Sequence, residues 1–125
     1  MKQYITTLLL SLAAVFAPVE HVMIVTLAMI AMDLITGLLA ARKQAIPISS
    51  SGLRRTITKM FVYEIVIAMG FLVETYMTGA AIPVVKIITS FIGLTELKSC
   101  MENLDIINGS SILKTIIEKL GSQNQ

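Results

Sequence analysis

The sequence predicts an all-α integral membrane protein. Four strongly apolar stretches occupy most of the 125 residues. Hydrophobic residues make up 55% of the chain and charged residues only 14%, whereas about a quarter of a typical soluble domain is charged. Between the second and third stretches lies a predicted polar loop, the basic segment Arg42 to Lys59, with five positive charges and no acidic residue. Such a cluster beside hydrophobic spans indicates the cytoplasmic side of a membrane.

The first stretch, from about Tyr4 to Ala17, is short for a bilayer crossing and ends at Pro18. Lys2 followed by an apolar run that ends in small residues is similar to a signal peptide. However, Pro18 would directly follow the cleavage point, and the next stretch begins only four residues later. We therefore expect a retained short helix or signal-anchor. Three spans plus this N-terminal anchor are the alternative to four spans.

The other three stretches have the length and composition of membrane spans. The second, Val22 to Ala41, would extend about 30 Å as a helix, which is the thickness of the hydrocarbon core. The third runs from Met60 to Thr78 and contains two glutamates, and the fourth runs from about Ala81 to Leu97 and contains one lysine. Together with the first stretch they predict about four transmembrane helices.

Short turns join the stretches in pairs, at Pro18 to His21 and at Gly79 to Pro83. They predict two helical hairpins. A cytoplasmic basic segment, residues 42–59, then puts both turns outside and both termini inside. Nine of the ten lysines and arginines face the cytoplasm in this topology, and Lys86 is the exception. The opposite orientation would translocate all nine, so we expect a multi-pass protein with cytoplasmic termini.

The composition changes after residue 99, which predicts a transmembrane domain at 1–99 and a cytoplasmic segment at 100–125. Asn108-Gly109 is a turn signal, and Ser110 is a candidate helix N-cap. An apolar stripe at helical spacing follows, formed by Ile112, Leu113, Ile116, Ile117 and Leu120. The predicted amphipathic helix ends at Gly121, before a polar tail at 122–125. It either packs on its neighbours or the inner leaflet, or joins subunits.

Three motifs occur in order along the chain. They are Asp33-Leu34-Ile35-Thr36-Gly37, then Ser49-Ser50-Ser51-Gly52-Leu53 before Lys59, and then Glu96-Leu97-Lys98-Ser99-Cys100-Met101-Glu102-Asn103. Over about residues 33–120 this set resembles the phage holin family that includes the clostridial toxin-export holins. Members of that family often have isoleucine where this chain has Cys100.

The resemblance implies a protein that accumulates in the bacterial inner membrane, oligomerises and opens the membrane, so that an endolysin or a toxin leaves the cytoplasm. The implied partners are further copies of the chain, the lipid bilayer, an endolysin without direct binding, and an antiholin. A small oligomeric ion channel or a transporter accessory subunit is the alternative, with Asp33 and Lys86 serving conduction. We expect no cofactor, no nucleic acid and no enzymatic activity, because the single histidine and single cysteine offer no metal or redox motif.

Asp33 is the only charged residue of the second stretch and lies about eight residues inside its cytoplasmic end. A carboxylate at that depth costs on the order of 2.5 to 3.5 kcal/mol on insertion scales. Its helical neighbours are small, namely Thr36, Gly37, Ala40 and Ala41, and small residues let helices approach closely. These residues predict a helix–helix or subunit face. The alternative is a protonated Asp33 that is hydrogen-bonded within one subunit.

Three further charged residues lie within the third and fourth stretches. Glu74 and Lys86 have similar depths on either side of the outer turn, so they either form an ion pair or extend separately to the outer interface. Glu64 lies about one turn inside the third stretch, and we expect it to extend toward Lys59 and the neighbouring arginines.

Polar and small residues share one face of the fourth stretch and its continuation. This polar stripe comprises Lys86, Thr89, Ser90, Gly93, Glu96, Cys100 and Asn103. It predicts a surface that faces water or another subunit, unless it holds the bundle together. The last motif predicts a hydrogen-bond cluster rather than an acid–base pair, because no nucleophile, metal ligand or phosphate loop accompanies it. The pore or subunit-interface candidates are Asp33, Thr36, Gly37, Glu64, Glu74, Lys86, Ser90, Gly93, Glu96, Ser99, Glu102 and Asn103.

Overall fold

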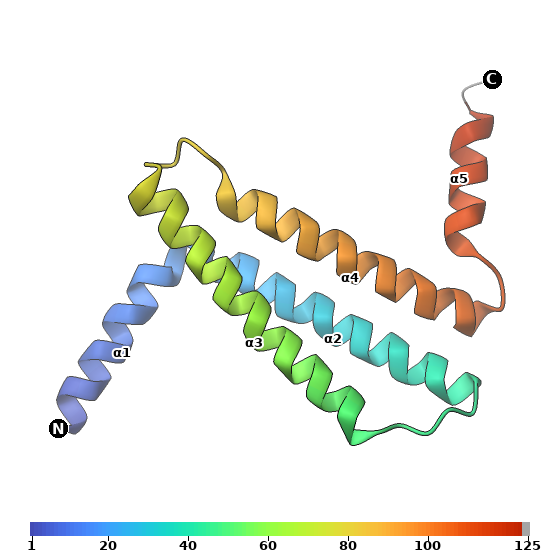
Figure 1. The fold of residues 1–125 in the computed structure, drawn as a ribbon, viewed down its shortest axis with the longest axis horizontal. Helices are drawn as coiled ribbons and strands as arrows, with labels where there is room; N and C mark the ends of the chain where they lie inside the picture. Colours follow the sequence, from blue (N-terminus) through green and yellow to red (C-terminus); the bar gives the residue numbers. More distant parts are fainter. Residues whose placement is uncertain (124–125) are drawn as a thin grey trace.

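The predicted all-α class is confirmed by the structure, a computed structural model that describes residues 1–123 apart from the side chain of Leu113. Three long helices form a bundle, and one further helix projects from each end of it (Figure 1). The elements in chain order are α1 (Lys2–Phe16), the 3₁₀ turn η1 (Ala17–Val19), α2 (Glu20–Lys43), α3 (Ser50–Leu72), the π-helical turn η2 (Val73–Met77), α4 (Val84–Asn108) and α5 (Ile112–Ser122).

The bundle consists of α2, α3 and α4. The most extensive contact is between α2 and α4, which run parallel, while α3 runs antiparallel to both (Figure 1). Ile30 of α2 and Ile67 of α3 are completely buried, and Ile92 of α4 is nearly so. Helices α3 and α4 approach closely at Gly70, where a Cβ would lie 2.6 Å from Cδ1 of Ile88. These contacts make a small apolar core along the bundle axis.

The predicted first hairpin is not formed. Helix α1 has no buried residue, and it leaves the bundle at a steep angle (Figure 1). Pro18 does not reverse the chain, because its restricted φ suits the first turn of a helical segment and it lies within η1. The end of α1 is held instead by Phe16, whose ring centroid lies 6.0 Å from that of Phe71, next to buried Val19 and Val85.

The basic segment at 42–59 is mostly helical and is not a loop. Helix α2 continues to Lys43, and α3 begins at Ser50. The early start of α3 has a local cause: Ser49 is its N-cap, and its Oγ accepts a hydrogen bond from the Gly52 amide at 3.3 Å. Only residues 44–49 connect the two helices. Lys59 therefore lies on α3, more than two turns inside the helix.

The C-terminal part differs from the prediction in its boundaries. Helix α4 continues beyond Leu97 to Asn108, and Gly109 ends it in the left-handed conformation with φ of 73°, so the predicted turn is confirmed. Ser111 rather than Ser110 caps α5, because the Ser111 Oγ accepts from the Lys114 amide at 3.3 Å. The helix runs one residue past Gly121. The role of the Leu113 side chain in the predicted apolar stripe, and residues 124–125 of the predicted tail, lie outside the described residues.

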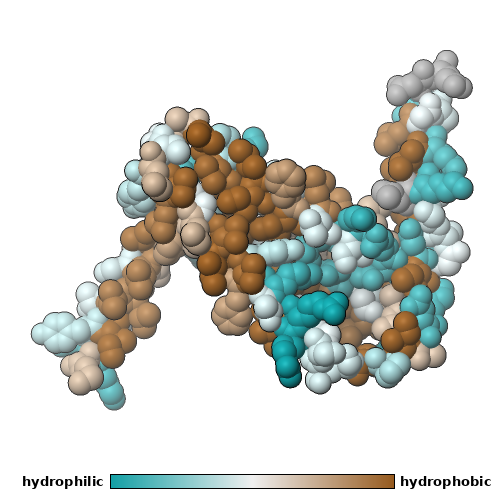
Figure 2. Space-filling view, viewed as in Figure 1, coloured by the Kyte–Doolittle hydropathy of each residue, from teal (hydrophilic) through white to brown (hydrophobic). Residues whose placement is uncertain are grey.

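The described part of the chain has a far larger accessible surface than a compact soluble protein of its mass, and many large apolar side chains are exposed on it. Its accessible area is 9341 Å², whereas a compact monomer of 13.6 kDa has about 6,600 Å². Figure 2 shows apolar side chains over α1 and the adjoining end of the bundle, while polar ones gather at the opposite end, near residues 44–49 and α5. Two helical stretches, Lys2–Lys43 and Ser50–Met77, are long and apolar enough to cross a membrane.

Candidate functional site

Charged side chains from all three bundle helices meet near the polar end of the bundle. The Nζ of Lys59 on α3 lies 2.8 Å from Oδ2 of Asp33 on α2 and 2.7 Å from Oε2 of Glu96 on α4. Glu96 is the most buried of the three, with 1% of its side chain exposed, compared with 15% for Asp33 and 25% for Lys59. One lysine thus bridges two carboxylates that come from the two parallel helices.

Neutral side chains complete the hydrogen bonding of both carboxylates. The hydroxyl of Tyr63 donates to Oε1 of Glu96 at 3.1 Å, and Nδ2 of Asn103 donates to Oδ1 of Asp33 at 3.2 Å. With the two bonds from Lys59, each oxygen of Asp33 and Glu96 has a partner. Hydrogen bonds to all four carboxylate oxygens offset the cost of burying the two charges. We call Asp33, Thr36, Lys59, Tyr63, Glu96 and Asn103 the ion cluster.

The small face predicted beside Asp33 brings α2 and α4 together within one chain. Asn103 also donates to Oγ1 of Thr36 at 3.1 Å. A Cβ at Gly37 would lie 3.5 Å from Nδ2 of Asn103, and Ala40, one turn further along, is only 3% exposed. The lack of side-chain bulk at these positions is what lets the Asn103 amide reach α2. Part of this face is therefore covered by α4 within the described chain.

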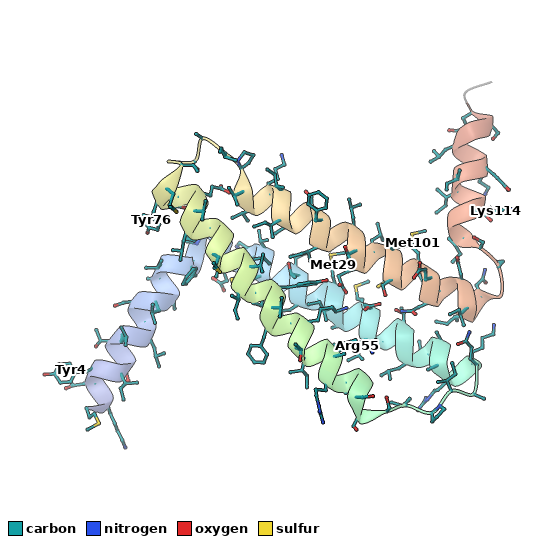
Figure 3. The ribbon with its side chains drawn as sticks, in the orientation of Figure 1. Tyr4, Met29, Arg55, Tyr76, Met101 and Lys114 are labelled. Atoms are coloured by element: carbon teal, nitrogen blue, oxygen red, sulfur yellow. The ribbon has the colours of Figure 1, made fainter. Side chains whose placement is uncertain are left out.

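A cleft of about 440 Å³ opens beside the ion cluster, between α2, the 44–49 connection and α3. Its lining includes Asp33, Gly37, Gly52, Lys59, Ser99 and Asn103. Residues from all three sequence motifs therefore meet around one cleft, although they are far apart in the chain. Figure 3 shows Arg55 on α3 at this end of the bundle, where α3 begins. The arrangement ties three helices together and holds charge, and it contains no group placed as a nucleophile within the described residues.

Glu74 does not form the ion pair with Lys86, which was one of the two arrangements predicted for it. Its Oε2 accepts a hydrogen bond from the backbone amide of Val85 at 2.8 Å, so it caps the start of α4. The first amides of a helix have no intrahelical acceptor and carry a partial positive charge, which makes them good partners for a carboxylate. Lys86, the predicted ion-pair partner, is exposed on α4 and makes no ion pair in the described part of the chain.

Glu64 does not extend toward Lys59, as the sequence predicted. Both of its carboxylate oxygens are buried and have no hydrogen-bond partner among the described residues. Glu64 lies on the side of α3 that faces the bundle, one turn from the buried Ile67. Lys59 is already held by Asp33 and Glu96. The bundle thus holds one carboxyl group without a hydrogen-bond partner among the described residues.

The polar stripe of α4 divides into two parts. In its C-terminal half, Glu96 and Asn103 enter the ion cluster and Ser99 lines the cleft. In its N-terminal half, Lys86 and Ser90 are exposed, and the Ser90 hydroxyl donates to the Lys86 carbonyl at 2.7 Å. Charged and amide side chains of the stripe point into the bundle where Lys59 and Asp33 are their hydrogen-bond partners.

Two other predicted candidates on α4 lie outside the ion cluster. Glu102 is exposed and lies 3.7 Å from Lys98, one turn away on the same helix. Gly93 has open space where a Cβ would stand. It lies in a shallow groove of about 350 Å³ between α2 and α4, which Val25, Met29 and Thr89 also line.

Sequence reasoning missed two members of the ion cluster. The sequence predicts Lys59 as a residue of the basic segment, as a partner of Glu64 and as part of the family resemblance, and it gives no role to Tyr63. Tyr63 follows Lys59 by four residues, so the two share one helix face. That spacing, with a lysine at the start of an apolar stretch, was the signal available for finding them.

Comparison with known proteins gives one match. A family model described as the Bacteriophage holin family matches residues 11–123. No curated protein and no solved structure matches the chain. The matched region includes every member of the ion cluster and the whole three-helix bundle.

Proposed function

The chain belongs to the bacteriophage holin family, whose members are non-enzymatic proteins that permeabilise membranes, and we propose that it oligomerises in the bacterial inner membrane and opens it to release an endolysin or a toxin. The observation that carries the proposal is the family match over residues 11–123, on a helical bundle that exposes apolar side chains along its length. A lipid environment is the one in which such a surface is stable.

The proposed topology has three spans, α2, α3 and α4, with the 44–49 connection and the C-terminus in the cytoplasm. The positive charges at the start of α3 support this orientation. Helix α1 has 15 residues and would extend about 22 Å, less than the roughly 30 Å of the hydrocarbon core. Because Phe16 holds its end at the outer end of the bundle, we propose that α1 is an N-terminal anchor at the outer interface.

Cysteine accessibility tests this topology. In a Cys100→Ser background, an impermeant maleimide added outside should label cysteines at Gln3 and Gly79 but not at Ser50. Protection of position 3 together with labelling of position 79 would show that α1 crosses the membrane and would restore the four-span alternative. Labelling at Ser50 would reverse the whole orientation.

Assembly requires a face that the single chain leaves unoccupied. The small face at Gly37 is covered by α4 in the same chain, but the groove at Gly93 is open. Thr89 and Gly93 are four residues apart on α4, which is the small-xxx-small spacing that lets transmembrane helices approach closely. We therefore propose that subunits meet along this groove, with Lys86 and Ser90 at its outer end.

A matched pair of glycine substitutions tests the groove. Gly93→Leu should leave the monomer stable, because nothing lies within 4 Å of the position, but should strongly reduce cross-linked oligomers and delay lysis. Gly37→Leu should instead displace Asn103 and destabilise the monomer. Parental cross-linking by the Gly93→Leu variant would exclude the groove as the subunit interface.

The function itself is tested in a bacterial host that also expresses a cytoplasmic endolysin. Induction of the chain should cause a sudden fall in turbidity only when the endolysin is present. It should also release a large cytoplasmic enzyme when the cell wall is removed. Leakage of potassium without release of the enzyme would refute the holin proposal and support the alternative of a small ion channel.

A further inference from the structure

Helix α5 projects from the polar end of the bundle, and among the described residues its main contact with another helix is with α4. Figure 1 shows it turning sharply away from the axis of α4, so that it crosses that axis instead of continuing it. Ile116, Ile117 and Leu120 are 44% to 60% exposed. An apolar face of this kind needs a partner that the chain itself does not supply.

The turn before α5 is fixed by specific contacts. Gly109 takes the left-handed conformation, the Asp105 Oδ1 accepts from the Ile112 amide at 2.6 Å, and Ser111 caps the helix. The ammonium of Lys43, at the end of α2, donates to the carbonyl of Ile107. The direction of α5 is therefore set against the ends of both α2 and α4. If α4 crosses the membrane, α5 lies along the plane of the membrane surface.

Charge is distributed on α5 as on a helix that lies in a membrane surface. At 3.6 residues per turn, the four residues Ile112, Ile116, Ile117 and Leu120 occupy an arc of about 140°. Lys119 falls about 20° beyond one edge of this arc and Lys114 about 60° beyond the other. Glu118 lies on the opposite side, toward water. Figure 3 shows Lys114 near the base of α5, close to the bundle.

We propose that α5 binds the inner leaflet of the membrane, with its apolar face at the boundary between headgroups and acyl chains and with Lys114 and Lys119 on anionic headgroups. Lysine side chains at the edges of an apolar face can extend their ammonium groups to phosphates while their stems stay in the apolar layer. Each such lysine gains favourable electrostatic energy at an anionic surface. A second copy of the chain could cover the apolar face, but it would not explain the lysines at both edges of that face.

The test uses the full chain in lipid nanodiscs that hold a single copy, so that both membrane faces are accessible and a second copy is absent. In a Cys100→Ser background, a fluorophore is attached at position 117 in one variant and at the adjacent position 118 in a matched control. A quencher on the lipid acyl chain near the headgroup should quench position 117 several-fold more than 118. Iodide in the water should show the reverse order.

The lipid specificity is tested in the same discs. In discs of mixed phosphatidylcholine and phosphatidylglycerol, the double variant Lys114→Gln/Lys119→Gln should lose most of the acyl-chain quenching at 117. Equal access of iodide to 117 and 118 would overturn the proposal, because the helix would then be free in water. Position 117 protected from both quenchers would also overturn it, because α5 would then pack on protein. Quenching that is unchanged in phosphatidylcholine alone would overturn the role of anionic headgroups.

This inference rests on the proposed cytoplasmic placement of α5, but its measurement has no lysis readout. A chain that lyses cells and fails the quenching test overturns the α5 proposal alone. A chain that passes the quenching test and releases no large enzyme overturns the proposed function alone.

Discussion

Replacing Lys59 by methionine should destabilise the bundle far more than removing either of its carboxylate partners. Lys59 is the single cation between Asp33 and Glu96, at 2.8 and 2.7 Å. In Lys59→Met the two carboxylates remain close together with no cation between them. In Asp33→Asn or Glu96→Gln, by contrast, one lysine still faces one carboxylate. The variants therefore differ in the charge left inside the bundle, while the side chains keep similar sizes.

The magnitude follows from burial. Removing one partner of a buried ion pair costs about 3 to 5 kcal/mol, because a charge is left without compensation. Lys59 keeps 25% of its side chain exposed, and water screens part of the interaction. We therefore expect the lower end, about 3 kcal/mol, or more than a hundredfold in the folding equilibrium. For Glu96→Gln we expect about 1 kcal/mol, the loss of one charge-assisted hydrogen bond in a cluster that otherwise persists.

The measurement is the helical circular dichroism signal of the full chain in mild detergent micelles, titrated with dodecyl sulfate. Lys86→Met is the matched control, since Lys86 is exposed on α4, and it should unfold with the parental midpoint. The triple variant Lys59→Met/Asp33→Asn/Glu96→Gln should recover most of the lost stability, because no charge remains buried in the cluster. A Lys59→Met variant as stable as Glu96→Gln, or a triple variant no better than Lys59→Met, would refute this account.

Three further substitutions test other contacts in the same titration. Glu74→Ala should cost about 1 kcal/mol, because the cap on the Val85 amide is lost; an unchanged midpoint would show that the cap contributes nothing. Gly70→Leu should cost about 1 to 3 kcal/mol by forcing α3 and α4 apart at Ile88, and parental stability would contradict the close approach. Gly109→Ala should cost about 1 kcal/mol because its φ is 73°; since the turn also sets the direction of α5, acyl-chain quenching at position 117 should fall as well.

The helical fold could be predicted because hydropathy and charge act locally. The apolar stretches predicted where the long helices lie, and Asn108-Gly109 predicted the turn that follows α4. Helix starts were less predictable, because a single Ser49 side chain moved the beginning of α3 into the basic segment. The prediction of the first hairpin was wrong for a related reason, since Pro18 is compatible with a helical turn as well as with a reversal of the chain.

Four members of the ion cluster, Asp33, Thr36, Glu96 and Asn103, could be predicted as candidates from the sequence, but their pairing could not. Helical periodicity indicates which side of a helix Asp33 or Glu96 occupies, but it does not give the register between helices. Register decides that Lys59 reaches Glu96 and leaves Glu64 unpartnered, although Glu64 is much nearer in sequence. The register also places the Glu74 carboxylate against a backbone amide at the start of α4 and not against Lys86.

The parallel pairing of α2 with α4 imposes an order on synthesis. The two helices are separated in the chain by the whole of α3, so α3 must be translated before the most extensive contact of the bundle can form. Asp33 and Lys59 can meet as soon as α3 has emerged, while Glu96 and Asn103 are still being translated. When only α2 and α3 have been translated, Asp33 is the single carboxylate of the ion cluster that is available to Lys59. Arrival of α4 adds the second carboxylate and the Asn103 amide together, so the last bundle helix to be translated also closes it.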